Sequence, residues 1–115
     1  TTEGPITHFH LHFLLELTAH LGMLPAGNWS EATPLFDLKE GSFTKDHPGH
    51  PEYLDEEQAA LMFTLLHARH NELGGITSTR QQRNQLLVEL IRYYRYHVEG
   101  MREINSLKVL REVMG

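Results

Sequence analysis

The most regular pattern of apolar and polar positions lies between residues 79 and 98. Apolar side chains recur there every three or four residues, at Leu86, Leu87, Leu90, Ile91, Tyr94 and Val98. This spacing puts them on one side of a helix, and that side must be buried against the rest of the chain. We therefore expect a long central helix, with Ser78 or Thr79 as its N-terminal cap and Gly100 as its stop.

Residues 6–22 form a second helical segment, which is unusually apolar. We expect Gly22 to end this helix, because glycine tolerates the left-handed conformation that follows many helices. The side expected to be buried carries Phe9, Phe13, Leu14, Leu17 and Leu21, widened by Leu11 and Leu15. A stripe of this width predicts burial on more than one side of the helix.

A third helix is expected to begin after Asp55, because Asp55 and Gln58 have the spacing of a capping box. The glycine pair Gly74-Gly75 is its expected end. Its predicted buried side chains are Leu61, Met62, Leu65, Leu66 and Leu73. These positions recur at helical spacing, so this helix is also expected to pack on the central one.

Between residues 23 and 53 the helical periodicity disappears, and prolines and glycines interrupt the sequence. Within this irregular stretch, residues 35–44 alternate apolar and polar around Lys39-Glu40-Gly41, which predicts a small β-hairpin packed on the helices. A last short helix, capped by Asn105 or Ser106, is expected near the C-terminus. The sequence therefore predicts one mainly all-α domain over residues 1–115, with about four helices and one inserted β-hairpin.

The composition is that of an ordinary globular chain, with 40% hydrophobic and 22% charged residues. No apolar run approaches the roughly 18 residues of a membrane span, and the start does not resemble a signal peptide. We therefore expect a cytoplasmic protein that does not contact a membrane. The chain has no cysteine, which excludes disulfides and thiolate zinc sites.

The net charge is −5, but the two halves of the chain differ in sign. Residues 1–58 carry two basic and ten acidic residues, whereas residues 59–115 carry eight basic and five acidic ones. A local cationic surface on the second half can bind DNA phosphates or an acidic peptide despite the acidic total. The residues expected to form this surface are Arg80, Arg83, Arg92, Arg95, Lys108 and Arg111.

Arg80 and Arg83 fall on the first turn of the central helix, in line with its apolar stripe. Cations there meet the positive end of the helix dipole, which costs about 0.3–1 kcal/mol each unless an anion offsets it. One interpretation is an anion site formed by both arginines and the free N–H groups of this turn. The alternative is an internal ion pair with Glu52 or Glu72.

Three tyrosines, Tyr93, Tyr94 and Tyr96, alternate with Arg92 and Arg95 in the same helix. Helical spacing turns Tyr94 toward the core and places Tyr93 and Tyr96 on a flank beside Arg92. One interpretation is that these two rings stack on bases while the arginines bind phosphates. The other is simple packing of the helix.

Nine histidines raise the question of a metal site. His8 and His12 have a spacing that can chelate zinc, and His47 and His50 form a second weak candidate. Neither pair belongs to an H-E-x-x-H pattern, and single histidines mostly bond to solvent or backbone. No metal and no cofactor is therefore expected.

No catalytic residue is expected either. The sequence lacks a cysteine nucleophile, a G-x-S-x-G elbow, a G-x-x-x-x-G-K-[ST] loop and the glycine pattern of dinucleotide-binding domains. The chain is therefore not expected to be an enzyme. The alternative function is a histidine-dependent metal-binding helical module with hydrolytic or regulatory activity.

Four stretches together resemble a known family. They are HFHLHFLLELTAHLGMLP, LFDLKEGSF, YLDEEQAALM and RQQRNQLLVELIRYYRYHVEGMREINSLKVLREVM. The most specific part is R-x-x-R-N-x-L-L, followed by I-x-Y-Y-x-x-H and S-L-x-V-L-x-E. These stretches resemble the C-terminal helical domain of the bacterial recombination mediator RecO, in a form without cysteines.

This resemblance implies a role in DNA repair. RecO proteins anneal complementary strands and, with RecR, help to load recombinase onto DNA covered by single-stranded DNA-binding protein. In the family, an N-terminal OB-fold domain carries much of the binding of single- and double-stranded DNA. The helical domain also contacts DNA, and it docks the acidic C-terminal tail of single-stranded DNA-binding protein.

The chain departs from the family pattern in two respects. It lacks the OB fold, so it is expected to be one part of a longer protein. Many relatives hold zinc with four cysteines in the loop that corresponds to residues 23–53, and this chain has no cysteine there. The resemblance therefore implies a hairpin that stands on apolar packing alone.

Overall fold

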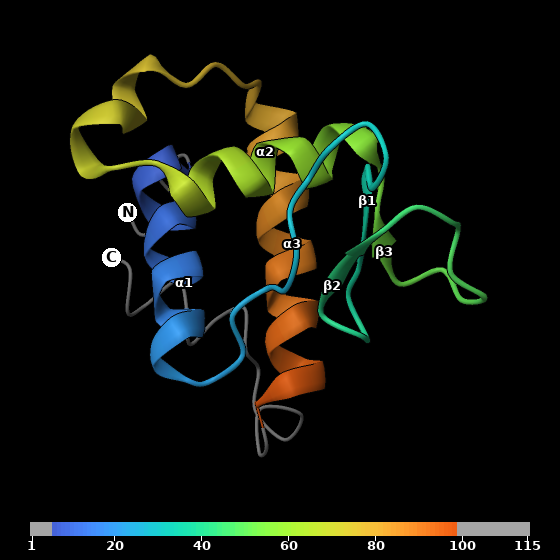
Figure 1. Cartoon of the computed structure of the whole chain (residues 1–115). Coiled ribbons are helices and arrows are strands. Elements are labelled where there is room, and N and C mark those ends of the chain that lie inside the picture. Colours follow the sequence, from blue (N-terminus) through green and yellow to red (C-terminus); the bar gives the residue numbers. More distant parts are fainter. Residues whose placement is uncertain (1–5, 99–115) are drawn as a thin grey trace.

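The computed structural model describes residues 6–98. Three α-helices, α1 (His8–His20), α2 (Glu56–His67) and α3 (Arg80–His97), pack together with a 3-10 helix, η1 (His70–Gly75). The helices α1 and α3 lie side by side and run in the same direction, and α2 crosses them near their first turns (Figure 1). The expected mainly α-helical fold is confirmed, whereas the expected helix at residues 105–113 lies outside the described residues.

The expected hairpin is present, and a third strand that the sequence did not predict completes a small antiparallel sheet. Strand β1 (Leu35–Asp37) lies between β2 (Ser42–Thr44) and β3 (Tyr53–Leu54). Phe36 pairs with Phe43 across the hairpin and with Leu54 on the other side. The sheet packs on the helices because Phe36, Leu38 and Leu54 are fully buried, as a hairpin of this size requires.

The central helix has the buried side that its periodicity predicts. Leu86, Leu87, Leu90, Ile91 and Tyr94 are all buried. Thr79 caps the helix: its hydroxyl accepts a hydrogen bond from the Gln82 N–H (3.0 Å), and the Gln82 side chain accepts one from the Thr79 N–H (2.7 Å). This reciprocal pair is a capping box. The helix ends at His97, before the expected stop at Gly100.

The first helix begins and ends as expected but buries a different side. Gly22 has φ of +75°, and the Met23 N–H donates to the Thr18 carbonyl across the helix end, which is a Schellman motif. The buried side consists of Leu11, His12, Leu14, Leu15 and Thr18. The expected burial of Phe9, Phe13 and Leu21 is wrong, because they are 39–50% exposed. Apolar residues occur all around this helix, so their spacing alone could not predict which side is buried.

The second helix is shorter than predicted. Asp55 caps its start by accepting from the Gln58 N–H (2.8 Å), as expected. The helix ends at His67 rather than at Gly74-Gly75. Arg69 begins a new turn, in which its N–H donates to the Glu72 carboxylate (2.6 Å), and both glycines belong to η1. Leu73 is buried as predicted. The apolar spacing therefore continues although the α-helix ends before Leu73.

Candidate functional site

The last turns of α3 and the residue before β3 enclose a pocket of about 420 Å³. Its lining residues are Arg92, Arg95, Tyr96 and Glu52. The three α3 residues are one turn or less apart, so the helix presents them on one outward side. Arg92 and Arg95 are exposed, because helical spacing turns both away from the apolar stripe. The pocket therefore joins two neighbouring cations, an aromatic ring and a carboxylate.

A third cation comes from the turn of the hairpin. The Lys39 ammonium lies 5.8 Å from the centre of the Tyr96 ring and 4.0 Å from the Glu52 carboxylate. The first distance is within the range of a cation–π interaction. His97 also fixes the helix end to this turn, because its Nε2 lies 2.8 Å from the Leu38 carbonyl. The hairpin and α3 are thus joined directly beside the pocket.

Two carboxylates partly balance these cations. The Arg92 guanidinium lies 3.4 Å from Glu89, one turn earlier on the helix. Burial raises the pKa of Glu89, and the Arg92 charge opposes that rise, while Asp55 and Glu52 add to it. Between residues 6 and 98 no carboxylate lies within ion-pair distance of Arg95. Among the described residues, Arg95 therefore has no carboxylate partner, and it can bind an external anion.

The Glu52 carboxylate has an unusual environment. The Glu52 N–H donates to His50 Nδ1 (3.1 Å), and His50 Nε2 lies 3.2 Å from the Asp37 carboxylate. Glu52 Oε2 lies 3.3 Å from the same His50 Nδ1 that accepts the Glu52 N–H. Glu52 Oε2 is buried and accepts no hydrogen bond from the described residues.

The two arginines at the start of α3 have different surroundings. Arg83 donates from Nε to the Ile6 carbonyl (2.8 Å) and from Nη1 to the Ser78 carbonyl (2.8 Å). It therefore connects the start of α1 with the start of α3. Within the described residues it pairs with neither Glu52 nor Glu72, so the alternative of an ion pair with one of these two residues is wrong for Arg83. Arg80 is exposed.

Of the two interpretations of the tyrosine flank, simple packing of the helix holds for Tyr93. Tyr93 and Tyr94 are both 2% exposed. The Tyr93 hydroxyl donates to the Met23 carbonyl, and the Tyr94 hydroxyl donates to the Leu14 carbonyl (2.6 Å). The Tyr93 ring also packs on Phe36. The hairpin covers this flank of the helix, so only Tyr96 keeps a surface that a base or peptide can reach. Lys108 and Arg111 lie outside the described residues.

The histidine pairs suggested by spacing do not form metal sites. His8 bonds to the Leu73 carbonyl (3.2 Å) and the Ser78 hydroxyl (2.6 Å) rather than facing His12. His47 bonds to the Tyr53 hydroxyl (3.1 Å), whereas His50 faces Asp37. Each of these three rings forms a hydrogen bond with a residue that sequence spacing alone does not identify.

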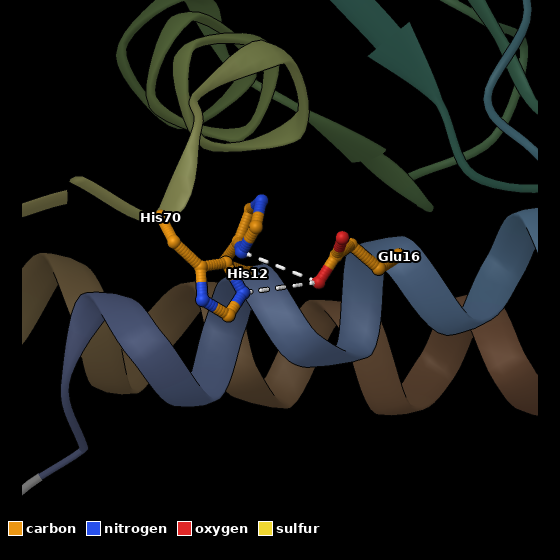
Figure 2. Close-up of side chains that lie close together, drawn as sticks. All are labelled: His12, Glu16 and His70. Carbon is orange, nitrogen blue, oxygen red and sulfur yellow. Dashed lines mark ion pairs between the residues drawn. The ribbon is translucent and has the colours of Figure 1, made fainter. Parts of the chain in front are cut away.

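Another trio, His12, Glu16 and His70, does come together. Figure 2 shows that both imidazoles point to the same oxygen of Glu16, which lies 3.5 Å from His12 Nδ1 and 3.6 Å from His70 Nε2. All three potential ligand atoms lie within 4.8 Å of one another, and no other such group of three occurs among residues 6–98. His12 and Glu16 have i, i+4 spacing, but nothing in the sequence indicates that η1 brings His70 to them.

Fold and site together define a small, mainly helical domain with a charged pocket on its longest helix. No helix in the described part of the chain has the length and hydropathy of a membrane span. Three of the residues that line the pocket lie within five positions of α3, namely Arg92, Arg95 and Tyr96. Lys39 and Glu52 were not predicted as site residues, because only the packing of the three-stranded sheet on α3 brings them close to these α3 residues.

Curated proteins similar to this chain are DNA repair proteins of the RecO type. The chain is 34% identical to DNA repair protein RecO of Christiangramia forsetii over 96% of its own length and 45% of that protein. It is 36% identical to RecO of Flavobacterium psychrophilum over 94% of its length and 44% of that protein. RecO of Phocaeicola vulgatus is 30% identical over 96% of this chain and 46% of its own.

These matches confirm the resemblance to RecO. The chain spans slightly less than half the length of the curated relatives it matches, which is consistent with a C-terminal RecO domain. No protein-family model matches the chain. No solved structure matches it either.

Proposed function

We propose that this chain is a non-enzymatic interaction domain of a cytoplasmic recombination mediator. In this proposal it supports strand annealing and recombinase loading through contacts with DNA, RecR and the acidic tail of single-stranded DNA-binding protein. The RecO relatives, which are named as DNA repair proteins, support the repair role. The division into this helical domain and a separate OB-fold domain is part of the same proposal.

The observation that carries the proposal is the mixed charge of the pocket. Arg92 and Arg95 offer exposed guanidinium groups, which bind carboxylates and phosphates in bidentate geometry. Tyr96 offers a ring against which a side chain can pack. Glu52 adds a carboxylate to the pocket wall. An acidic peptide with a free C-terminus fits this combination, because it carries both carboxylates and N–H donors.

DNA is a second ligand in this proposal, but the pocket suits it less well. Phosphates carry no N–H donor for the Glu52 carboxylate, whereas a peptide backbone does. We assign DNA contacts to the outward arginines Arg80, Arg92 and Arg95, together with Lys108 and Arg111 beyond the described residues. A base stacked on Tyr96 would belong to the same contact.

The experiment is a fluorescence-anisotropy titration of the chain with an acidic peptide that ends in a free carboxylate. The variants are Arg92→Ala with Arg95→Ala, Glu52→Gln, and Arg80→Ala as a control that removes an exposed arginine elsewhere on the same helix. We expect the double variant to weaken binding at least about tenfold, or about 1.4 kcal/mol. Arg80→Ala should change it less than about twofold, and added salt should weaken the wild type.

Parallel titrations with a single-stranded oligonucleotide separate the two ligands. If the double variant loses the oligonucleotide but keeps the peptide, the pocket is a DNA contact and the peptide site lies elsewhere. If the folded double variant binds both as tightly as the wild type, the proposed site is wrong. Circular dichroism establishes that each variant is folded.

A further inference from the structure

We propose that His12, Glu16 and His70 bind one divalent transition-metal ion, with zinc as the expected occupant. The three side chains come from two elements, α1 and η1, and meet at the surface where these elements pack. His12 is 3% exposed and is fixed by its helix, whereas the side chains of Glu16 and His70 are mostly exposed. The proposal shares no residue with the cationic pocket and does not depend on it.

The distances suit an ion between the groups better than direct hydrogen bonds. An N–H···O hydrogen bond usually joins atoms about 2.7–3.2 Å apart. Here the Glu16 oxygen lies 3.5 Å from His12 Nδ1 and 3.6 Å from His70 Nε2. Metal–ligand bonds of about 2.0–2.1 Å in a tetrahedral zinc site place neighbouring ligand atoms about 3.3–3.4 Å apart. These two separations therefore need only small side-chain movements, and the third, between the two imidazole nitrogens, is at most 4.8 Å.

Neighbouring rings hold the exposed histidine in place. The His70 ring meets the Phe9 ring edge to face at 5.7 Å and the His12 ring at 5.2 Å. Glu16 lies one helical turn after His12, so both ligands from α1 project from the same side. Two histidines and one carboxylate are therefore already aligned before an ion arrives.

The chemistry of the ligands selects the class of metal. Two imidazole nitrogens and one carboxylate oxygen favour zinc and related transition-metal ions over magnesium or calcium, which prefer oxygen ligands. With three protein ligands, the fourth tetrahedral position faces solvent and is filled by water. The ion ties η1 to α1, adding to the link that His8 makes with the Leu73 carbonyl and the Ser78 hydroxyl.

The test is a titration of the chelator-treated chain with Co²⁺, whose visible absorption reports tetrahedral coordination, and with Zn²⁺ by competition against a chromophoric chelator. Glu16→Gln and His70→Ala remove single ligands from exposed positions, so the fold should be retained. His20→Ala is the matched control, because His20 is exposed on the same helix. We expect one ion per chain, at least about tenfold weaker binding in both ligand variants, and no change in the control.

Thermal unfolding with and without Zn²⁺ is a second readout. An ion that binds the folded chain raises its melting temperature, so zinc should stabilise the wild type and His20→Ala but not Glu16→Gln or His70→Ala. The proposal is overturned if the wild type binds no stoichiometric ion. It is also overturned if Glu16→Gln and His70→Ala bind Co²⁺ and Zn²⁺ as tightly as the wild type.

Discussion

At the scale of single residues, several polar side chains join one element to another through hydrogen bonds. Tyr93 and Tyr94 donate buried hydrogen bonds to carbonyls of Met23 and Leu14. Tyrosine suits this position because its ring fills the core while its hydroxyl reaches a backbone acceptor. Burial raises the pKa of Tyr93 to about 12, and it raises that of Tyr94 as well, with a further contribution from neighbouring Tyr93.

These raised pKa values predict a loss of stability in alkali. An unfolded tyrosine ionises near pH 10, so above that pH the unfolded chain releases protons that the folded chain retains. Stability from the two tyrosines is therefore complete below about pH 10 and falls as the pH rises toward about 12. Urea unfolding as a function of pH measures this loss.

The control is the double variant Tyr93→Phe and Tyr94→Phe. It should be less stable at neutral pH by about 1 kcal/mol for each lost hydrogen bond. Its urea midpoint should fall less steeply between about pH 10 and pH 12, because the two ionisable hydroxyls are gone. A fall as steep as in the wild type would show that other groups cause the alkaline loss.

At the scale of elements, the start of α3 acts as a junction. Arg83 bonds to the carbonyls of Ile6 and Ser78, and His8 on α1 bonds to the Ser78 hydroxyl. A guanidinium is well suited to this role, because its fork of donors can reach two acceptors at once. The unfavourable position of a cation at a helix N-terminus is offset here by carbonyl oxygens rather than by an anion.

Arg83→Ala should therefore destabilise the fold, whereas Arg80→Ala should not. We expect a loss of about 1–3 kcal/mol in the free energy of unfolding for Arg83→Ala, since hydrogen bonds from a charged donor are lost. Arg83→Lys should recover only part of it, and Arg80→Ala should stay within about 0.5 kcal/mol of the wild type. Urea denaturation measures all three. Unchanged stability with lost peptide binding in Arg83→Ala would instead support the anion site.

At the scale of the whole molecule, the two candidate sites lie on different sides of the central helix. In Figure 1, α1 and η1 lie on one side of α3, and the hairpin lies on the other. The charged pocket uses the hairpin side, and the His12, Glu16 and His70 cluster uses the other. Although the first half of the chain is acidic, its Lys39 lies beside the pocket residues Tyr96 and Glu52. Folding thus mixes the charges that the linear sequence separates.

This arrangement predicts two independent sites. His70→Ala should bind the acidic peptide as the wild type does, and the Arg92→Ala, Arg95→Ala variant should bind Co²⁺ as the wild type does. Both affinities should stay within about twofold, because effects at sites without shared partners usually add within about 0.3–0.5 kcal/mol. The same titrations, performed on both variants, measure this. A larger change in either direction would show that α3 couples the two sites.

The sequence by itself determined the elements whose signals are local. Apolar spacing located the buried side of α3, turn residues located the hairpin, and capping residues such as Thr79 and Asp55 located two helix starts. These signals depend on neighbours within about one helical turn or one hairpin, so the chain carries them without its tertiary partners. The exposed positions of Arg92 and Arg95 followed from the same periodicity.

Only the tertiary structure decided which residues far apart in sequence come into contact. An all-round apolar α1 has no unique side until α2 and α3 pack on it, so the burial of His12 and the exposure of Phe9 could not be predicted. Tyr93 is buried because the hairpin covers it. The hairpin also brings Lys39 beside Tyr96, and the segment before β3 brings Glu52 to the pocket. His70 meets Glu16 only because α2 stops early and η1 turns back. Each of these contacts joins residues far apart in sequence, where no spacing rule applies.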